Sequence, residues 1–115
     1  HLNPVRITVI LKPFRLEPVQ AAVADLGATG ITVQDVRGRG NSEEGGRTIT
    51  SPFTSNSLPV RSKLTVVVPE EMQEQVIASI LEHGQTGESG DGKIFVERVI
   101  EAVRIRTGER GDSAV

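Results

Sequence analysis

Two halves of this chain repeat one succession of hydrophobic patterns, and this repetition restricts the fold more than any other feature. Each half contains a run with apolar side chains at every second position, a run with the three-to-four spacing of an amphipathic helix, and a second strand-like run. The segments are residues 5–11, 17–26 and 30–36 in the first half, and residues 60–68, 69–84 and from about 92 in the second. This βαββαβ order predicts an α+β ferredoxin-like sandwich with an antiparallel sheet and both helices on one face.

The two halves are separated by residues 37–59, which follow neither period and are rich in Gly, Ser and Thr. A loop this long inside a compact domain is usually functional or disordered. We interpret it as one mobile loop within a single domain, residues 1–115, because neither half is large enough to fold alone. A sheet covered on one face leaves its other face and its edges available, which favours oligomerisation.

The stretch from Gln85 to Val96 combines three glycines with Lys93 just before a strand-like run. Glycines let backbone N–H groups approach an anion closely, and a lysine adds a charge suited to phosphate. Gly87, Gly92 and Lys93 match part of the P-loop pattern, but Ile94 replaces its Ser or Thr and the loop leads from helix to strand. We therefore exclude a P-loop and keep two readings, a phosphate cradle and an ordinary glycine-rich turn.

Two further groups of residues suggest anion binding. Arg104 and Arg106 would share one face if residues 100–105 continued the last strand or added an edge strand, and two guanidinium groups there would clamp a phosphate. Alternatively, the two arginines lie on a solvated edge beside acidic neighbours and bind nothing. Gly38 and Gly40, interleaved with arginines, allow close backbone approach or form a loop hinge.

Composition argues against several classes of function. A net charge of −2 with three Phe as the sole aromatics disfavours nucleic-acid binding, and the absence of Cys excludes disulfides and thiolate metal sites. His1 and His83 are isolated, so we expect no metal. Carboxylates do not pair convincingly for acid–base chemistry, so we expect no enzyme. No apolar run reaches membrane-spanning length, and we expect a cytoplasmic protein without direct membrane insertion.

Six segments, taken together, resemble the PII signalling proteins over nearly the whole chain. They are Lys12–Phe14, Gly30–Val33, Val36–Gly40, Val67–Pro69, Thr86–Val96 and Arg104–Glu109. The resemblance implies a homotrimer that binds adenine nucleotide in clefts between subunits. It also implies a T-loop at about residues 39–59, a B-loop at about 85–93 and a C-terminal loop at about 104–115. The implied nucleotide-binding residues are Thr32, Gly38, Arg39, Gly40, Arg61, Gly90, Asp91, Gly92 and Lys93, with Arg104 and Arg106 from the adjacent subunit.

The chain departs from the family pattern in the T-loop. PII proteins usually read Gly-Phe-Gly-Arg-Gln where this chain reads Gly38 to Ser42, and Ser42 is too short to replace the glutamine that helps hold magnesium and 2-oxoglutarate. Thr54 stands where the family has its modified tyrosine, which excludes tyrosine uridylylation. We therefore expect ADP or AMP as ligand, with ATP as a further candidate.

The function expected from this resemblance is a trimeric sensor whose T-loop recruits or releases a target protein. Divergent relatives in carbon-fixing bacteria suggest bicarbonate as a second ligand, held by Arg39 and Arg61, and a bicarbonate transporter or carboxysome-related protein as the partner. Two alternatives remain open. One is a CutA-like trimeric metal-binding protein, and the other is a slow nucleotide hydrolase in which Asp91 or Glu109 positions water.

Overall fold

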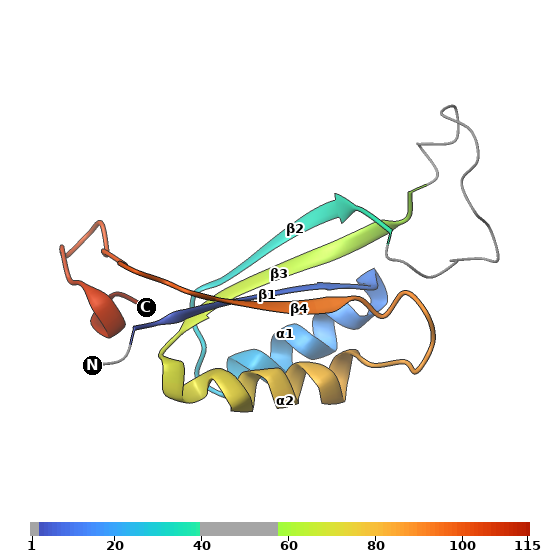
Figure 1. Cartoon of the computed structure of the whole chain (residues 1–115), viewed down its shortest axis with the longest axis horizontal. Helices are drawn as coiled ribbons and strands as arrows, with labels where there is room; N and C mark the ends of the chain where they lie inside the picture. The colour runs from blue at the N-terminus through green and yellow to red at the C-terminus, as the bar shows by residue number, and fades with distance from the viewer. Residues whose placement is uncertain (1–2, 40–57) are drawn as a thin grey trace.

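Four strands form one antiparallel sheet, and both helices cover the same face of it (Figure 1). The structure is a computed structural model that describes residues 3–39 and 58–115. The elements in chain order are β1 (Val5–Leu11), α1 (Leu16–Asp25), β2 (Ile31–Arg37), β3 (Val60–Val68), α2 (Gln73–Gly84) and β4 (Lys93–Arg98). The strands lie in the order β2-β3-β1-β4, which is the ferredoxin-like arrangement, so the predicted fold class is confirmed.

Short 3-10 turns lead into both helices. η1 (Pro13–Arg15) precedes α1, and η3 (Glu70–Met72) precedes α2, so the second α-helix begins four residues later than the sequence pattern indicated. Gly27 adopts a φ of 97° just beyond the end of α1, as expected of a residue that terminates a helix. Within residues 3–39 and 58–115, neither helix combines the length and hydrophobicity needed to cross a membrane.

The core lies between the helices and the two central strands. Alternate residues of β1 and β3 point toward α1 and α2 because successive side chains of a strand face opposite sides. Together with apolar residues of the helices they are almost completely buried. The main core residues are Val5, Ile7, Val9, Leu11, Val19, Val23, Leu64, Val66, Val68, Val76 and Ile80.

The face of the sheet turned away from the helices, called here the open face, has no covering within the described part of the chain. Directly paired residues of antiparallel strands lie on the same face, so the register defines its members. Its central row runs Thr32, Thr65, Thr8 and Phe95 across the four strands. Phe95 is 49% exposed there.

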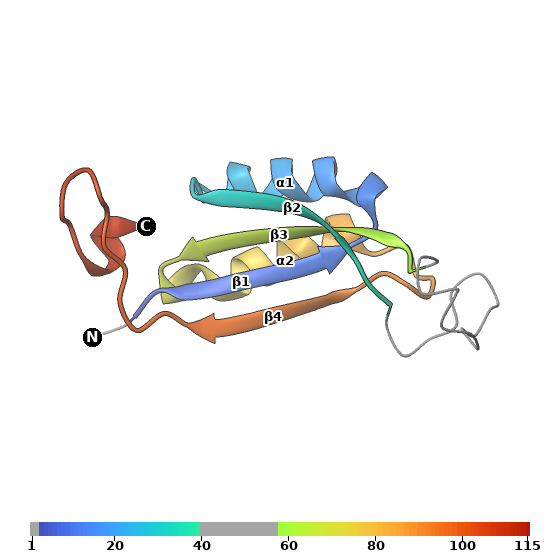
Figure 2. The same cartoon turned by 90° about the horizontal axis from the view of Figure 1, so that it is seen from above.

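Residues 100–105 do not form the strand that the sequence suggested. Val99 donates a hydrogen bond alongside β1, to the carbonyl of Pro4 at 2.9 Å, and beyond it residues 3–39 and 58–115 offer no neighbouring strand to pair with. Residues 104–109 instead form a tight turn, in which Gly108 N–H donates to the Arg104 carbonyl and Val103 bridges to Arg110. Residues 99–115, the C-terminal arm, project from the end of the sheet (Figures 1 and 2) and end in η4 (Gly111–Ala114).

Candidate functional site

Three glycines with left-handed backbone angles shape the B-loop, which we define as residues 85–93 between α2 and β4. Gly87, Gly90 and Gly92 have φ values of 84°, 89° and 101°. At Gly92 a side chain is also sterically excluded, because a Cβ atom there would lie 1.7 Å from the carbonyl oxygen of Ile10. The end of the B-loop is therefore pressed against the backbone of β1, an approach that only glycine permits.

The carboxylate of Asp91 is directed back into its own loop. It accepts hydrogen bonds from the backbone N–H of Thr86 at 2.8 Å and of Gly87 at 3.0 Å, and also from the Thr86 hydroxyl. The Lys12 ammonium lies 3.3 Å from Asp91 Oδ1 and donates to Thr86 Oγ1 at 3.2 Å. Asp91 thus closes the first part of the B-loop into a ring and ties it to the end of β1.

These contacts favour the ionised form of Asp91. The Thr86 hydroxyl, the N–H groups of Thr86 and Gly87 and the Lys12 ammonium hold the pKa of the Asp91 carboxyl well below its usual range, although partial burial acts in the opposite direction. Asp91 therefore carries a full negative charge at neutral pH, and Lys12 compensates it.

Four cationic side chains gather at the end of the open face next to the B-loop. Lys63 pairs with Ile10, which in turn pairs with Lys93, so the two lysines are about two strand spacings, roughly 10 Å, apart on one face. The pairing of Leu11 with Ser62 places the next residue, Lys12, beside Arg61. Among the described residues of this end of the face, Asp91 supplies a carboxylate, which lies 3.3 Å from the Lys12 ammonium.

The predicted T-loop base lies at the same end of the molecule as these cations. Gly38 N–H donates to the Pro59 carbonyl at 3.1 Å, and Arg37 Nη1 donates to the Leu58 carbonyl at 3.1 Å, so the two sides of the base are joined. Arg39 is half-buried, and its Nε atom is buried without a hydrogen-bond partner. Gly40, Ser42, Thr54 and the T-loop prediction between residues 40 and 57 lie outside the described residues.

Thr32 is exposed on the open face opposite Thr65, four residues before Val36, which pairs with Arg61. Arg104 and Arg106 occupy the turn of the C-terminal arm, at the opposite end of the molecule from the B-loop (Figures 1 and 2). The prediction that they share a strand face is wrong, because residues 104–109 form a turn. Within one chain they cannot join the cationic cluster.

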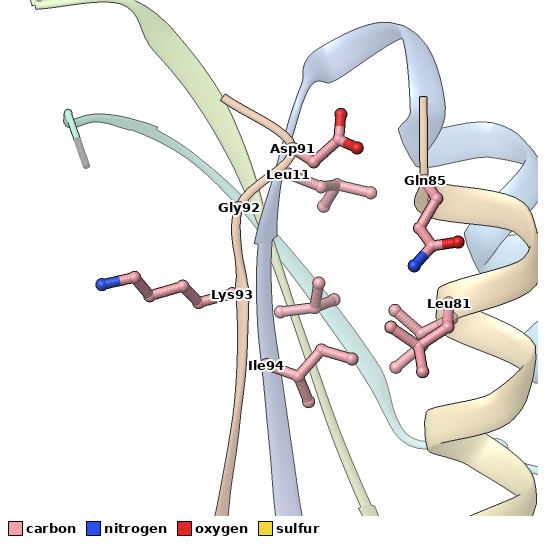
Figure 3. A pocket seen from close by; sticks show the side chains of 10 residues that line it. Leu11, Leu81, Gln85, Asp91, Gly92, Lys93 and Ile94 are labelled. Carbon is pink, nitrogen blue, oxygen red and sulfur yellow. The ribbon is translucent and has the colours of Figure 1, made fainter. Parts of the chain in front are cut away.

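A groove of about 310 Å³ opens between α2 and β4 on the helix side of the sheet. Figure 3 shows Leu81, Gln85 and Ile94 directed into it, whereas the Lys93 side chain points away. Its other lining residues are Val9, Leu11, Ile80, Gly84, Asp91 and Gly92. This groove is therefore distinct from the cationic end of the open face.

Sequence reasoning missed Lys12, Lys63 and Thr86. The first strand-like run is taken to end at residue 11, although continuing its alternation places Lys12 on the same face as Ile10. Lys63 follows Arg61 at a spacing of two residues and could have been found in the same way. The bond between Lys12 and Thr86 joins residues 74 positions apart, and no local pattern reveals it.

Comparisons with known proteins agree with this architecture. The family described as "Nitrogen regulatory protein P-II" matches residues 5–109. The chain is 42% identical to the nitrogen regulatory protein P-II of Haemophilus influenzae and 40% identical to P-II 1 of Escherichia coli K12, in each case over 96% of this chain and 98% of the relative.

A crystal structure of Arabidopsis thaliana PII bound to citrate superposes with a TM-score of 0.80 at 36% identity, covering 99% of this chain and 94% of that one. The fold, the near-complete coverage and the level of identity all lead to one conclusion: this chain belongs to the P-II family of nitrogen regulatory, signal-transducing proteins.

Proposed function

We propose that this PII-family regulator binds an adenine nucleotide between the subunits of a homotrimer, and that the bound nucleotide sets the conformation of the T-loop. One observation supports the proposal most directly: the glycine-shaped B-loop, Lys93 and the base of the predicted T-loop meet at one cationic end of the open face. Backbone N–H groups at left-handed glycines and converging ammonium and guanidinium groups are the donors that polyphosphate requires.

The position of the C-terminal arm supports a site shared between chains. Arg104 and Arg106 lie far from the B-loop of their own chain, and Ile105 between them is fully exposed. A second copy that covers the open face would bury Phe95 and bring its arm to the B-loop of its neighbour. We accordingly assign Thr32, Gly38, Arg39, Gly40, Arg61, Gly90, Gly92 and Lys93 to one subunit's share of the site, and the two arm arginines to the adjacent subunit.

We further propose ADP or AMP as the preferred nucleotide and a small anion, bicarbonate, as a second ligand at Arg39 and Arg61. The buried Arg39 Nε without a partner supports an anion there. The citrate bound to Arabidopsis PII supports the binding of carboxylate-type anions by this family. The target would be a protein that reads the T-loop, with a bicarbonate transporter or a carboxysome-related protein as the candidates.

The two alternative functions find less support. Asp91, proposed to position water in a hydrolase, already has its carboxylate engaged by Thr86, Gly87 and Lys12. Glu109 accepts from Thr107 at 2.8 Å and lies on the exposed arm. For a CutA-like metal protein, residues 3–39 and 58–115 contain no cluster of three or more His, Cys, Asp or Glu side chains arranged to hold a metal.

Isothermal titration calorimetry tests the proposal. AMP, ADP and ATP are each titrated into the full chain, with and without bicarbonate and 2-oxoglutarate. We expect saturable binding of ADP or AMP that bicarbonate strengthens and 2-oxoglutarate leaves unchanged. The absence of heat with all three nucleotides would refute the site, and strong synergy between MgATP and 2-oxoglutarate would show that Ser42 does not prevent the usual family response.

A further inference from the structure

The backbone N–H groups of the B-loop fall into two sets. Those of Thr86 and Gly87 donate to the Asp91 carboxylate, and that of Glu88 donates to Thr86 Oγ1 at 3.2 Å. Within the described residues, those of Ser89, Gly90 and Gly92 make no hydrogen bond. The first half of the loop has therefore satisfied its donors internally, while the second half, which leads into Lys93, has donors to offer.

We infer that Asp91 is a positioning residue rather than a nucleotide ligand: with Lys12 and Thr86 it latches the first half of the B-loop, so that only the second half, residues 89–93, is presented to the phosphates. This inference rests on the proposed nucleotide binding and changes the role that the family resemblance implied for Asp91. It assigns functions to Lys12 and Thr86, which had none.

Electrostatics support this division of the B-loop into a latched first half and a phosphate-binding second half. A carboxylate that pointed toward phosphates would repel them, and this one is turned into the loop. The Lys12 ammonium, 3.3 Å from Asp91 Oδ1, neutralises most of its field. Both side chains are largely shielded, with 17% and 25% of the Lys12 and Asp91 side chains exposed, so solvent weakens the pair less than it would a surface pair.

Preorganisation supports it as well. A loop of three glycines loses much conformational freedom on binding unless it is already held in the bound shape. The latch uses a charged acceptor that receives several hydrogen bonds at once, and such bonds are stronger than neutral ones. Because the latch also connects to Lys12 beside Arg61, it fixes the distance between the B-loop and the T-loop base.

The test is amide hydrogen exchange, which is monitored by NMR on the full chain with and without ADP. In the free protein, the amides of Thr86 and Gly87 should exchange slowly although their loop is exposed, and those of Ser89, Gly90 and Gly92 should exchange fast. Addition of ADP should shift and protect the second set while the first set changes little. Shifts of equal size at Thr86 and Gly90 would overturn the inference.

Variants separate the latch from general loop damage. Asp91→Asn and Thr86→Val should each speed exchange at Gly87 by tenfold or more and weaken ADP binding by about tenfold, because hydrogen bonds to a charged group are lost. Thr86→Ser keeps the hydroxyl and should restore both properties. Glu70→Gln is the matched control, since it removes an equal charge with the same 25% exposure that pairs with Arg98, away from the open face and the B-loop.

The double variant Asp91→Asn, Thr86→Val should bind ADP no more weakly than the worse single variant, because both changes break the same latch. Losses that multiply would indicate independent contacts with the nucleotide and would overturn the inference. If ADP shifted no B-loop amide at all, the proposed nucleotide binding would be refuted. The inference that the latch presents residues 89–93 to the phosphates would then be refuted as well. Exchange in the free protein would still decide whether the latch exists.

Discussion

Gly92 is a residue at which the B-loop leaves no room for a side chain. Gly92→Ala would place a methyl group against the Ile10 carbonyl at a positive φ, whereas Gly87→Ala meets no atom within 4 Å at a similar φ. We expect Gly92→Ala to destabilise the fold by about 2–4 kcal/mol, through displacement of backbone, and to abolish ADP binding. Gly87→Ala should cost only about 1–2 kcal/mol of backbone strain. Urea unfolding measures the stability of the two variants, and calorimetry measures their ADP binding. Equal losses of stability in the two variants would contradict the steric argument.

The charge of Asp91 leads to a prediction about pH. Its pKa is lower in the folded state than in the unfolded chain, so its contribution to stability is fully present above the unfolded value of about 3.9 and is lost as the pH falls toward the folded value. The difference in unfolding free energy between wild type and Asp91→Asn should therefore be constant from pH 7 to 5 and shrink below pH 4. A difference in unfolding free energy that grew on acidification would show that folding does not lower the pKa of Asp91.

At the level of elements, hydrophobic periodicity was sufficient to predict the fold. The alternation in residues 5–11 and 60–68 corresponds to β1 and β3, whose alternate side chains form most of the core, and the helical spacing corresponds to α1 and α2. Local patterns failed where a partner was required. Residues 100–105 had the composition of a strand but lacked a neighbouring strand in the part of the chain that the structure describes, and Lys12 acquired its role from residues far along the chain. The glycines that shape the B-loop could be identified from the sequence, because few residues other than glycine readily adopt a left-handed backbone conformation.

We propose that the homotrimer assembles through the open face. Phe95→Glu would place a charge at the centre of this face, where we propose that a second copy packs, and a buried unpaired charge opposes association strongly. We expect the variant to shift from trimer to monomer in sedimentation analysis while its circular dichroism spectrum is retained. Phe14→Glu is the control, because Phe14 is even more exposed, at 67%, but lies in η1 outside this face. An unchanged trimer in the Phe95 variant would exclude the open face as the interface.

For the whole molecule, the two proposed halves of the nucleotide site are far apart in one chain. This separation leads to a prediction that only an assembly of several chains can satisfy. Lys93 and the B-loop lie at one end of the chain's fold, and Arg104 and Arg106 lie in the arm at the other (Figure 1). A chain with Lys93→Ala lacks the first half, and a chain with Arg104→Ala and Arg106→Ala lacks the second. Each variant alone should bind ADP poorly, since each removes cations from every proposed site.

Mixing these two variants, with unfolding and refolding so that subunits exchange, should restore binding. In a cyclic trimer assembled at random from equal amounts, a site is intact when one subunit supplies Lys93 and its neighbour supplies the arm, which occurs for about one quarter of the sites. Calorimetry should then find ADP sites of normal affinity at about that stoichiometry, and none in either variant refolded alone. Refolded wild type should recover all sites. If mixing restored nothing although mixed trimers formed, the arm would not complete a neighbour's site, and the placement of Arg104 and Arg106 in the nucleotide cleft would have to be abandoned.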